Sequence, residues 1–224
     1  SLTYLSVVWY SLALASDGFL QVNAASVAIV ALISLWAIRL GSFLFLRIHK
    51  DGEDKRFRTI KPSATQFFMT WTLQGLWVSL CSMCALTAIS SDSGVVINAL
   101  FFIGLGLFLI GFGTEVIADN QKSKFRSVPE NRDKFITSGL WAKSRHPNYF
   151  GEIMLWTGIS VMSFSSLDGW QYLTLISPIF TYILLVYVSG VRMLEARSDK
   201  KWGDNEDYKK YKSRTPVLWL SLKN

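Results

Sequence analysis

Long apolar stretches separated by short polar segments dominate the pattern of this chain. A bilayer core of about 30 Å needs roughly 20 helical residues at about 1.5 Å each. Few ionised residues interrupt these stretches, chiefly Arg39 in the second and Glu115 near the end of the fourth. The pattern therefore predicts an all-α fold, a polytopic transmembrane helical bundle of about six spans. The six predicted spans are 2–16, 24–47, 66–89, 95–117, 148–166 and 170–190.

Basic residues follow only every second predicted span. All 23 Lys and Arg lie in three segments, with seven in 39–61, seven in 122–145 and nine in 192–223, and the three short connections contain none. Consecutive spans alternate sides, and basic loops stay in the cytosol. We therefore expect three cytosolic segments, in the inner membrane of a bacterium or the endoplasmic reticulum of a eukaryote. They are 48–65, 118–147 and 191–224.

Composition narrows the class of protein further. Half of the residues are apolar, and nine Trp, eight Tyr and fifteen Phe form an aromatic load typical of membrane interfaces. A net charge of +7 would otherwise suggest a nucleic-acid partner, but the predicted topology accounts for it. No linker separates a second domain, so we expect one transmembrane domain over 1–224, with 1–65 and 66–224 as its two parts. Because Ser1 opens almost directly into an apolar run, we expect that further residues precede it.

Two motifs that suggest cofactor or metal sites fit helix packing better. Cys81 and Cys84 share a helix face inside a predicted span, with no second ligand pair nearby. Gly104, Gly106, Gly111 and Gly113 lie within one apolar stretch. A dinucleotide-binding loop would need a strand before them, whereas small residues let helices approach closely. No metal site is expected, because the only other histidine beside His146 is His49.

Polar residues gather where the fourth span ends. Glu115 and Asp119 are spaced i,i+4, and Lys122 and Arg126 follow one turn apart. Ionisable residues at membrane depth are functional candidates. Asp119 could accept hydrogen bonds from ribose or amide groups, and the two basic residues could hold phosphate. A solvated helix end is the alternative interpretation.

Two further clusters lie at the cytosolic ends of the last two spans. Pro147 is expected to begin a helix that carries Asn148 and Glu152 on one face into the membrane. A helix cap would explain His146 or Asn148, but not an acidic residue one turn deeper. The other cluster surrounds Arg192 and Glu195, where basic anchors at the membrane interface are the alternative.

Five motif blocks resemble one membrane family. The chain is similar from about Trp36 to Trp219 to the steroid 5α-reductase-like family, specifically its DUF1295 branch. Sterol reductases are related, and isoprenylcysteine carboxyl methyltransferases share the C-terminal layout more distantly. The blocks are Gly52-Glu-Asp-x-Arg56-Phe, Glu115-Val-x-Ala-Asp119-x-Gln-Lys122, Ser138-Gly-Leu-Trp141, Ser-Arg145-His-Pro-Asn-Tyr-Phe-Gly-Glu152, and Lys-Trp-Gly203 with Tyr208-x-x-Tyr211.

The resemblance implies a bundle, usually of seven spans, with NADPH in a cytosolic-side cavity of the C-terminal half. It implies reduction of a carbon–carbon double bond in a lipophilic, steroid-like or enone substrate from the bilayer. From the charge distribution we expect no nucleic-acid partner, and no obligatory protein partner is evident. Tyr149 is the implied catalytic candidate. The implied cofactor-binding residues are Asp119, Lys122, Arg126, Trp141, His146, Asn148, Glu152, Arg192, Glu195 and Tyr208.

The chain departs from the family at the substrate end. The best-known members polarise the substrate ketone with a Glu in an early span and a Tyr in the next, and this sequence matches neither; Arg39 falls near the Tyr position. Two other functions stay open. One is an S-adenosylmethionine-dependent methyltransferase, whose cofactor lacks phosphates. The other is a transporter or structural membrane protein, which would need polar residues along the bilayer midplane.

Overall fold

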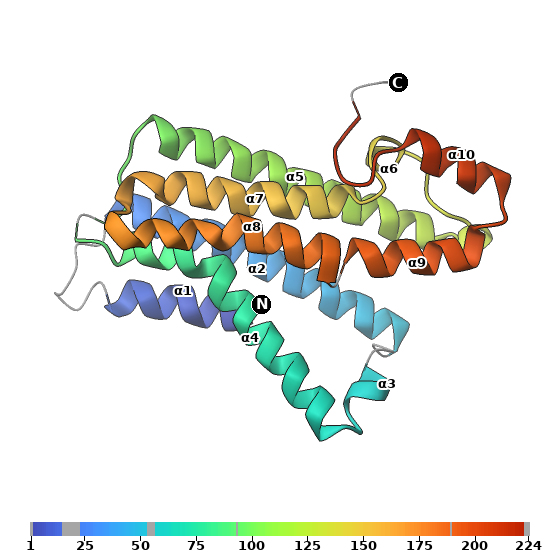
Figure 1. Cartoon of the computed structure of the whole chain (residues 1–224), viewed down its shortest axis with the longest axis horizontal. Coiled ribbons are helices and arrows are strands. Elements are labelled where there is room, and N and C mark those ends of the chain that lie inside the picture. Colours follow the sequence, from blue (N-terminus) through green and yellow to red (C-terminus); the bar gives the residue numbers. More distant parts are fainter. Residues whose placement is uncertain (1, 15–22, 53–56, 93, 189, 222–224) are drawn as a thin grey trace. The chain divides into compact units, whose positions relative to one another are not determined.

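The predicted all-α fold is confirmed by a computed structural model that describes residues 2–14, 23–52, 57–92, 94–188 and 190–221. Within these ranges the chain forms helices and connecting loops, without any strand (Figure 1). The helices are α1 (Leu2–Leu14), α2 (Ala24–Asp51), α3 (Phe57–Ile60), α4 (Ala64–Ile89), α5 (Ala99–Ser127), α6 (Leu140–Lys143), α7 (Pro147–Ser163), α8 (Ile176–Ile183), α9 (Val191–Trp202) and α10 (Glu206–Arg214).

Four of the described helical segments are long and apolar enough to cross a bilayer, namely Ala24–Lys50, Ala64–Ile89, Ala99–Ser127 and Gly169–Trp202. The other two predicted spans coincide with α1 and α7, which have 13 and 17 residues. Both are shorter than the roughly 20 residues of a perpendicular span. The helical class is thus established, while the count of six spans stays a prediction. The end of the first predicted span and the block at 53–56 lie outside the described residues.

Side-chain caps define where the long helices begin. Asn23 accepts a hydrogen bond from the Ser26 amide at 2.9 Å before α2, and Ser63 accepts one from Gln66 before α4. These bonds satisfy amides that have no partner in the first helical turn. Pro147 opens α7 as the sequence predicts, because a first-turn residue needs no backbone donor.

The chain forms two compact units. The first comprises Ser1–Phe102 and Ile159–Ser177. In it the rings of Tyr4 on α1 and Trp36 on α2 form a T-shaped pair, with centroids 5.0 Å apart, and the Trp9 indole donates to Ser34. Arg39 lies over the ring of Phe43, 5.3 Å from its centroid.

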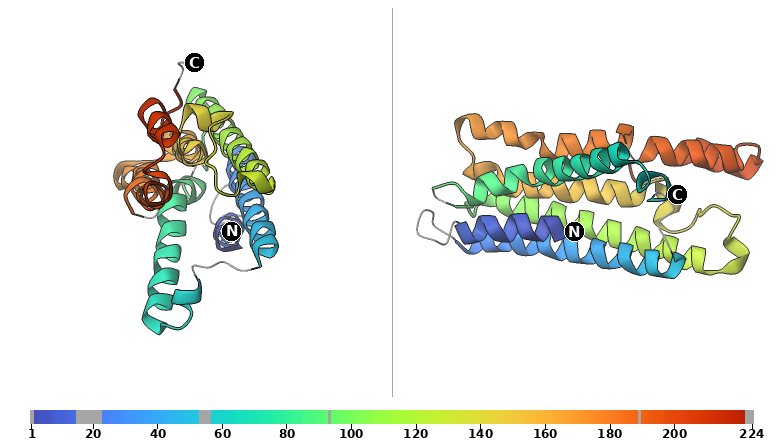
Figure 2. Two further views of the ribbon diagram at one scale, coloured as in Figure 1. Left: turned by 90° about the vertical axis from the view of Figure 1, so that its right-hand side faces the viewer. Right: turned by 90° about the horizontal axis from the view of Figure 1, so that it is seen from below.

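The second unit comprises Ile103–Gly158 and Pro178–Asn224. Its centre is the pair α5 and α7, which lie side by side in Figures 1 and 2. A Cβ atom on Gly151 would lie 2.5 Å from the carbonyl oxygen of Gly111, and one on Gly158 would lie 2.6 Å from that of Gly104. Such distances are too short for any side chain, so these glycines let the two backbones touch.

The glycine prediction is therefore correct for Gly104 and Gly111, which are seven residues apart on one face of α5. It is wrong for Gly106 and Gly113, where a Cβ would meet only open space. The period explains the difference, because a spacing of seven keeps two residues on the same helix face and a spacing of two does not.

The last apolar stretch is interrupted between α8 and α9. A π-helical turn, Leu184–Val188, ends the apolar segment, and α9 begins after Gly190. A Cβ on Gly190 would lie 2.2 Å from the Leu185 carbonyl and 2.9 Å from the Tyr149 ring. Only glycine fits here. The absence of a side chain lets the ring of Tyr149 pack against the start of α9. Turns of this kind occur frequently at functional sites.

Candidate functional site

The loop before α7 is attached to the C-terminal part of α5 by the side chain of Trp141. The indole nitrogen of this buried residue donates to the carbonyl of Ala118 at 3.0 Å. The ammonium of Lys122 lies 4.3 Å from the centroid of the indole ring, a separation typical of cation–π contacts. The amide of Leu140 donates to Gln121 at 2.9 Å. Lys122 and Trp141 are therefore brought together, beside the buried carboxylate of Asp119.

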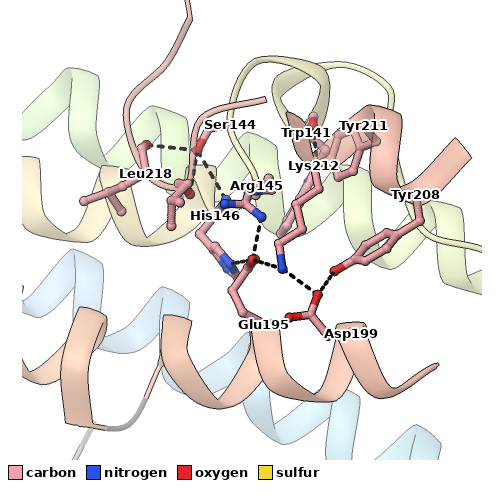
Figure 3. A network of polar contacts seen from close by, with 11 residues as sticks. Trp141, Ser144, Arg145, His146, Glu195, Asp199, Tyr208, Tyr211, Lys212 and Leu218 are labelled. Atoms are coloured by element: carbon pink, nitrogen blue, oxygen red, sulfur yellow. Dashed lines mark hydrogen bonds and ion pairs between the residues drawn. The ribbon is translucent and has the colours of Figure 1, made fainter. Parts of the chain in front are cut away.

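The next residues of the loop are held by the C-terminal tail. The fully buried Ser144 donates through its hydroxyl to the carbonyl of Leu218 at 2.9 Å and accepts from the amide of His146 at 3.2 Å. The amide of Arg145 donates to the carbonyl of Pro216 at 2.9 Å. The bonds to Leu218 and Pro216 join residues more than 70 positions apart. They fix Arg145 and His146 just before α7 begins (Figure 3).

One carboxylate on α9 binds two side chains of this loop. Glu195 accepts from Nη1 of Arg145 at 2.5 Å through one oxygen and lies 2.8 Å from Nε2 of His146 through the other. Lys212 of α10 lies 3.6 Å from the same carboxylate. Figure 3 shows these contacts. The side chains of Arg145 and His146 are 11% and 7% exposed, so this pairing takes place largely out of water.

A second carboxylate extends the network toward α10. Asp199 accepts from Lys212 at 2.5 Å and from the hydroxyl of Tyr208 at 3.1 Å. Burial is the main cause that raises the pKa of Tyr208 to about 12, and the hydrogen bond to Asp199 is the second. Burial also raises the pKa of Tyr211, whose hydroxyl donates to the carbonyl of Trp141 at 2.7 Å. Both phenols are therefore neutral donors at physiological pH.

His146 has one ring nitrogen bound and one without a partner. Nε2 faces Glu195, whereas Nδ1 is buried and has no hydrogen-bond partner among the described residues; the same holds for Nε of Arg145. Burial lowers the pKa of His146, although the hydrogen bond to Glu195 opposes this. The ring stacks on Tyr149 with centroids 5.7 Å apart and planes at 9°.

Two buried carboxylates lie where α5 and α7 touch. A Cβ on Gly151 would lie 2.7 Å from the backbone nitrogen of Glu115, so Glu115 and Glu152 occupy neighbouring positions on facing helices. The exposed fractions of these two residues are 3% and 7%. Asn148 is partly buried one turn before Glu152. A buried carboxylate is costly unless it is paired or hydrogen-bonded, and ionisable residues at membrane depth are functional candidates.

The predicted site residues thus fall into three groups. His146, Tyr149, Glu195 and Tyr208 are joined by the contacts described above, as are Lys122 and Trp141. Asp119, Asn148 and Glu152 lie on the buried faces and first turns of α5 and α7. Arg126 and Arg192 are exposed.

Sequence reasoning gave no role to three members of the network, Arg145, Asp199 and Lys212. A signal was present: Glu195 and Asp199 are four residues apart, and so are Tyr208 and Lys212. The two residues of each pair lie on one face of their helix. If the two faces meet, two carboxylates lie opposite a phenol and an amine. The spacing alone does not show that the two faces meet.

Comparisons with known proteins identify the family. The family model described as "Protein of unknown function (DUF1295)" matches residues 2–215. Bovine 3-oxo-5-alpha-steroid 4-dehydrogenase 1 is 29% identical over 50% of this chain and 39% of its own length. A probable O-methyltransferase, ustE, of Ustilaginoidea virens is 30% identical over 44% and 40%. Steroid 5-alpha-reductase DET2 of Gossypium hirsutum is 37% identical over 29% and 25%.

The chain thus matches at most about two fifths of the length of these relatives. No solved structure matches. The family match nevertheless covers most of the chain, and the four apolar helices agree with an integral membrane protein. The chain belongs to the DUF1295 family, in the steroid 5α-reductase-like group of membrane proteins.

Proposed function

We propose that this protein is an NADPH-dependent reductase of a carbon–carbon double bond in a lipophilic, steroid-like or enone substrate. The observation that supports it most is the mixed set of groups in the second unit. Buried carboxylates, Asp119 and Glu152, accompany cationic Lys122. Nε of Arg145 and Nδ1 of His146 have no hydrogen-bond partner in the part of the chain that the structure describes. Acceptors for hydroxyl and amide groups beside donors for phosphate are what a phosphorylated dinucleotide requires.

We assign the predicted site residues to successive parts of NADPH. Asp119 would accept from the adenosine part, and Lys122 and Arg126 would hold phosphate. Asn148 and Glu152 would receive the nicotinamide amide. Other predicted cofactor-binding residues would line the site or position the side chains that touch the cofactor. They are Trp141, His146, Arg192, Glu195 and Tyr208.

Bound NADPH would supply a hydride to the electron-poor carbon of an enone. The protein's own part is to orient the substrate, to exclude water and to stabilise the charge that develops on the substrate oxygen. Tyr149 is the proposed donor to that oxygen. Its ring is held between the imidazole of His146 and the backbone at Gly190, so its direction would be fixed before substrate binds.

A methyltransferase is the second candidate, because one similar protein is named a probable O-methyltransferase. S-adenosylmethionine carries a cationic sulfonium and no phosphate. The basic pair Lys122 and Arg126 beside Asp119 suits a phosphorylated cofactor better. We therefore rank the reductase first. A transporter or structural role ranks lower, because Arg39 is the main ionised residue in the interior of an apolar span.

Separate titrations of the detergent-purified protein with NADPH and with S-adenosylmethionine test the proposal. Nine tryptophans, Trp141 among them, provide a fluorescence signal. We expect saturable quenching by NADPH, weaker binding of NADH, and oxidation of NADPH when a 3-oxo-4-ene steroid is added as the probe enone. Saturable binding of S-adenosylmethionine without any binding of NADPH would overturn the proposal and favour the methyltransferase.

A further inference from the structure

The histidine of the site is oriented like a proton-transfer group. Its Nε2 lies 2.8 Å from one carboxylate oxygen of Glu195, whose other oxygen is held by Arg145. Its Nδ1 is buried and has no hydrogen-bond partner among the described residues. A carboxylate that binds one imidazole nitrogen fixes the tautomer and leaves the other nitrogen available for chemistry. The buried, unpartnered nitrogen indicates that a bound molecule completes this arrangement.

We propose that His146 is the proton donor that completes the reduction of the double bond, and that Glu195 is the positioning residue that directs Nδ1 toward the substrate. This inference rests on the proposed reductase function. It changes the expected role of His146 from a cofactor contact to a catalytic residue. Tyr149, stacked on the same imidazole, keeps its proposed contact with the substrate oxygen.

The proton and electron balance of the step is complete. The β-carbon of the enone would receive a hydride with its electron pair from bound NADPH, which would become NADP⁺. The electrons of the double bond then move to the α-carbon, with the negative charge shared by the oxygen. The α-carbon then forms a bond to the proton that leaves Nδ1, and the N–H electron pair stays on the ring. The other proton stays on Nε2, where it is hydrogen-bonded to Glu195. Solvent returns a proton to Nδ1 after the product leaves.

The charges around His146 determine its pH dependence. Glu195 of α9 faces it directly and raises its pKa. The positive charges of Lys122 on α5 and of Arg145, the preceding residue, lower its pKa. Lys212 of α10 reaches the same carboxylate, and Tyr149 is the titratable neighbour on α7. Burial, the largest effect, lowers the pKa of His146 below the ordinary 6.5. The donor form is therefore lost as pH rises, and turnover should fall steadily between pH 6 and pH 8.

The first test needs no activity. The chain has only two histidines, and His49 is exposed, so in His49→Gln protein labelled with ¹⁵N-histidine all imidazole signals come from His146. We expect a neutral ring with the proton on Nε2, titrating below pH 6.5. Glu195→Gln should mix the two tautomers and lower the pKa further, because it removes a negative charge, while Lys209→Ala should change neither. A neutral ring protonated on Nδ1 would overturn the assignment.

The second test separates this inference from the proposed function. His146→Gln should change the dissociation constant of NADPH by less than about threefold, but should reduce turnover of the probe enone by about 10²–10⁴-fold, the usual contribution of general acid catalysis. It should also abolish both the decline with pH and the solvent deuterium isotope effect. If His146→Gln keeps wild-type turnover, the inference fails and the reductase stands. If wild-type protein does not bind NADPH, both fail.

Discussion

Arg126 stands out among the predicted site residues because it is exposed, one turn beyond the half-buried Lys122 on α5. If it holds a phosphate, Arg126→Ala should weaken NADPH binding by about 1.5–3 kcal/mol, the range for hydrogen bonds to charged groups. Arg126→Lys should recover only part of this loss, because it lacks the planar fork of donors.

Lys124 is the matched control for Arg126, since it is also basic, exposed and on α5. Lys124→Ala should leave the affinity for NADPH within about 0.5 kcal/mol of wild type, the range for surface changes away from a site. Isothermal titration of the three variants at low and high salt provides the measurement. Equal affinities for Arg126→Ala and wild type, in folded protein, would remove Arg126 from the cofactor site.

Glu152 is the residue where a binding role and a structural role predict different outcomes. Arg145, one candidate ion-pair partner for a structural Glu152, is bound instead to Glu195. If Glu152 binds the nicotinamide amide, Glu152→Gln keeps the shape of the side chain and loses only its charge. It should retain the melting temperature and most of the affinity for NADPH, while turnover of the probe enone falls at least about tenfold because the nicotinamide is misplaced.

A structural Glu152 would instead lower the melting temperature and affinity together with turnover. Breaking one partner of a buried ion pair costs about 3–5 kcal/mol, which a thermal-unfolding experiment in detergent detects easily. Measuring unfolding, NADPH binding and NADPH oxidation on one preparation therefore separates the two roles. Gln121→Ala is a useful reference, since it removes a loop contact to Leu140 without changing a charge.

At the scale of the element, the close contact of α5 with α7 positions both carboxylates of the site. Gly151 touches the backbone of α5 at Gly111 and Glu115, and overpacked helix contacts typically cost about 1–3 kcal/mol. We expect Gly151→Ala to destabilise the protein by at least this much, because backbone atoms and not flexible side chains must move. It should also reduce NADPH binding, since Glu115 and Glu152 would shift apart.

Gly113 on the same helix supplies the control for Gly151. A Cβ at Gly113 meets nothing within 4 Å, and alanine favours a helix over glycine by up to about 1 kcal/mol. Gly113→Ala should therefore be neutral or stabilising in thermal unfolding. Equal melting temperatures for the two alanine variants would contradict the close helix contact.

Hydropathy predicted the helices but located their ends unevenly. The predicted span 95–117 ends at the polar residues, whereas α5 continues to Ser127, because Glu, Lys and Arg favour helices as strongly as many apolar residues. Hydropathy detects the apolar zone and not the helix end. It ended the last span at Gly190, where α9 begins, but it could not show that the ring of Tyr149 packs against that glycine.

The candidate site was predictable in its parts but not in its connections. The resemblance assigned Trp141, His146 and Glu195 to one cofactor site, and in the structure His146 and Glu195 are in contact. The pairing of Arg145 with Glu195 joins residues 50 positions apart, and the docking of Ser144 on the tail joins residues 74 apart. No periodicity within a single helix encodes such contacts, so they emerge only from the folded chain.

At the scale of the whole molecule, the basic segments should all face the cytosol. Accessible cysteines placed in different segments can test this, because the native Cys81 and Cys84 are fully buried and should react little. Asp92 lies in a short connection without basic residues, and Ser127 ends α5 within a basic segment; both are exposed. The charge pattern predicts that a membrane-impermeant maleimide labels Asp92→Cys on intact cells and spares Ser127→Cys.

Permeabilised cells provide the control for this topology, since Ser127→Cys should then react as fully as Asp92→Cys. Lys210→Cys on α10 should behave like Ser127→Cys, because it lies in the third basic segment. Labelling of Ser127→Cys in intact cells would reverse the orientation. The proposed site would then face away from the cytosolic pool of NADPH, so this experiment tests the proposed function as well as the topology. Agreement of all three positions would place the cofactor site on the side where its reductant is supplied.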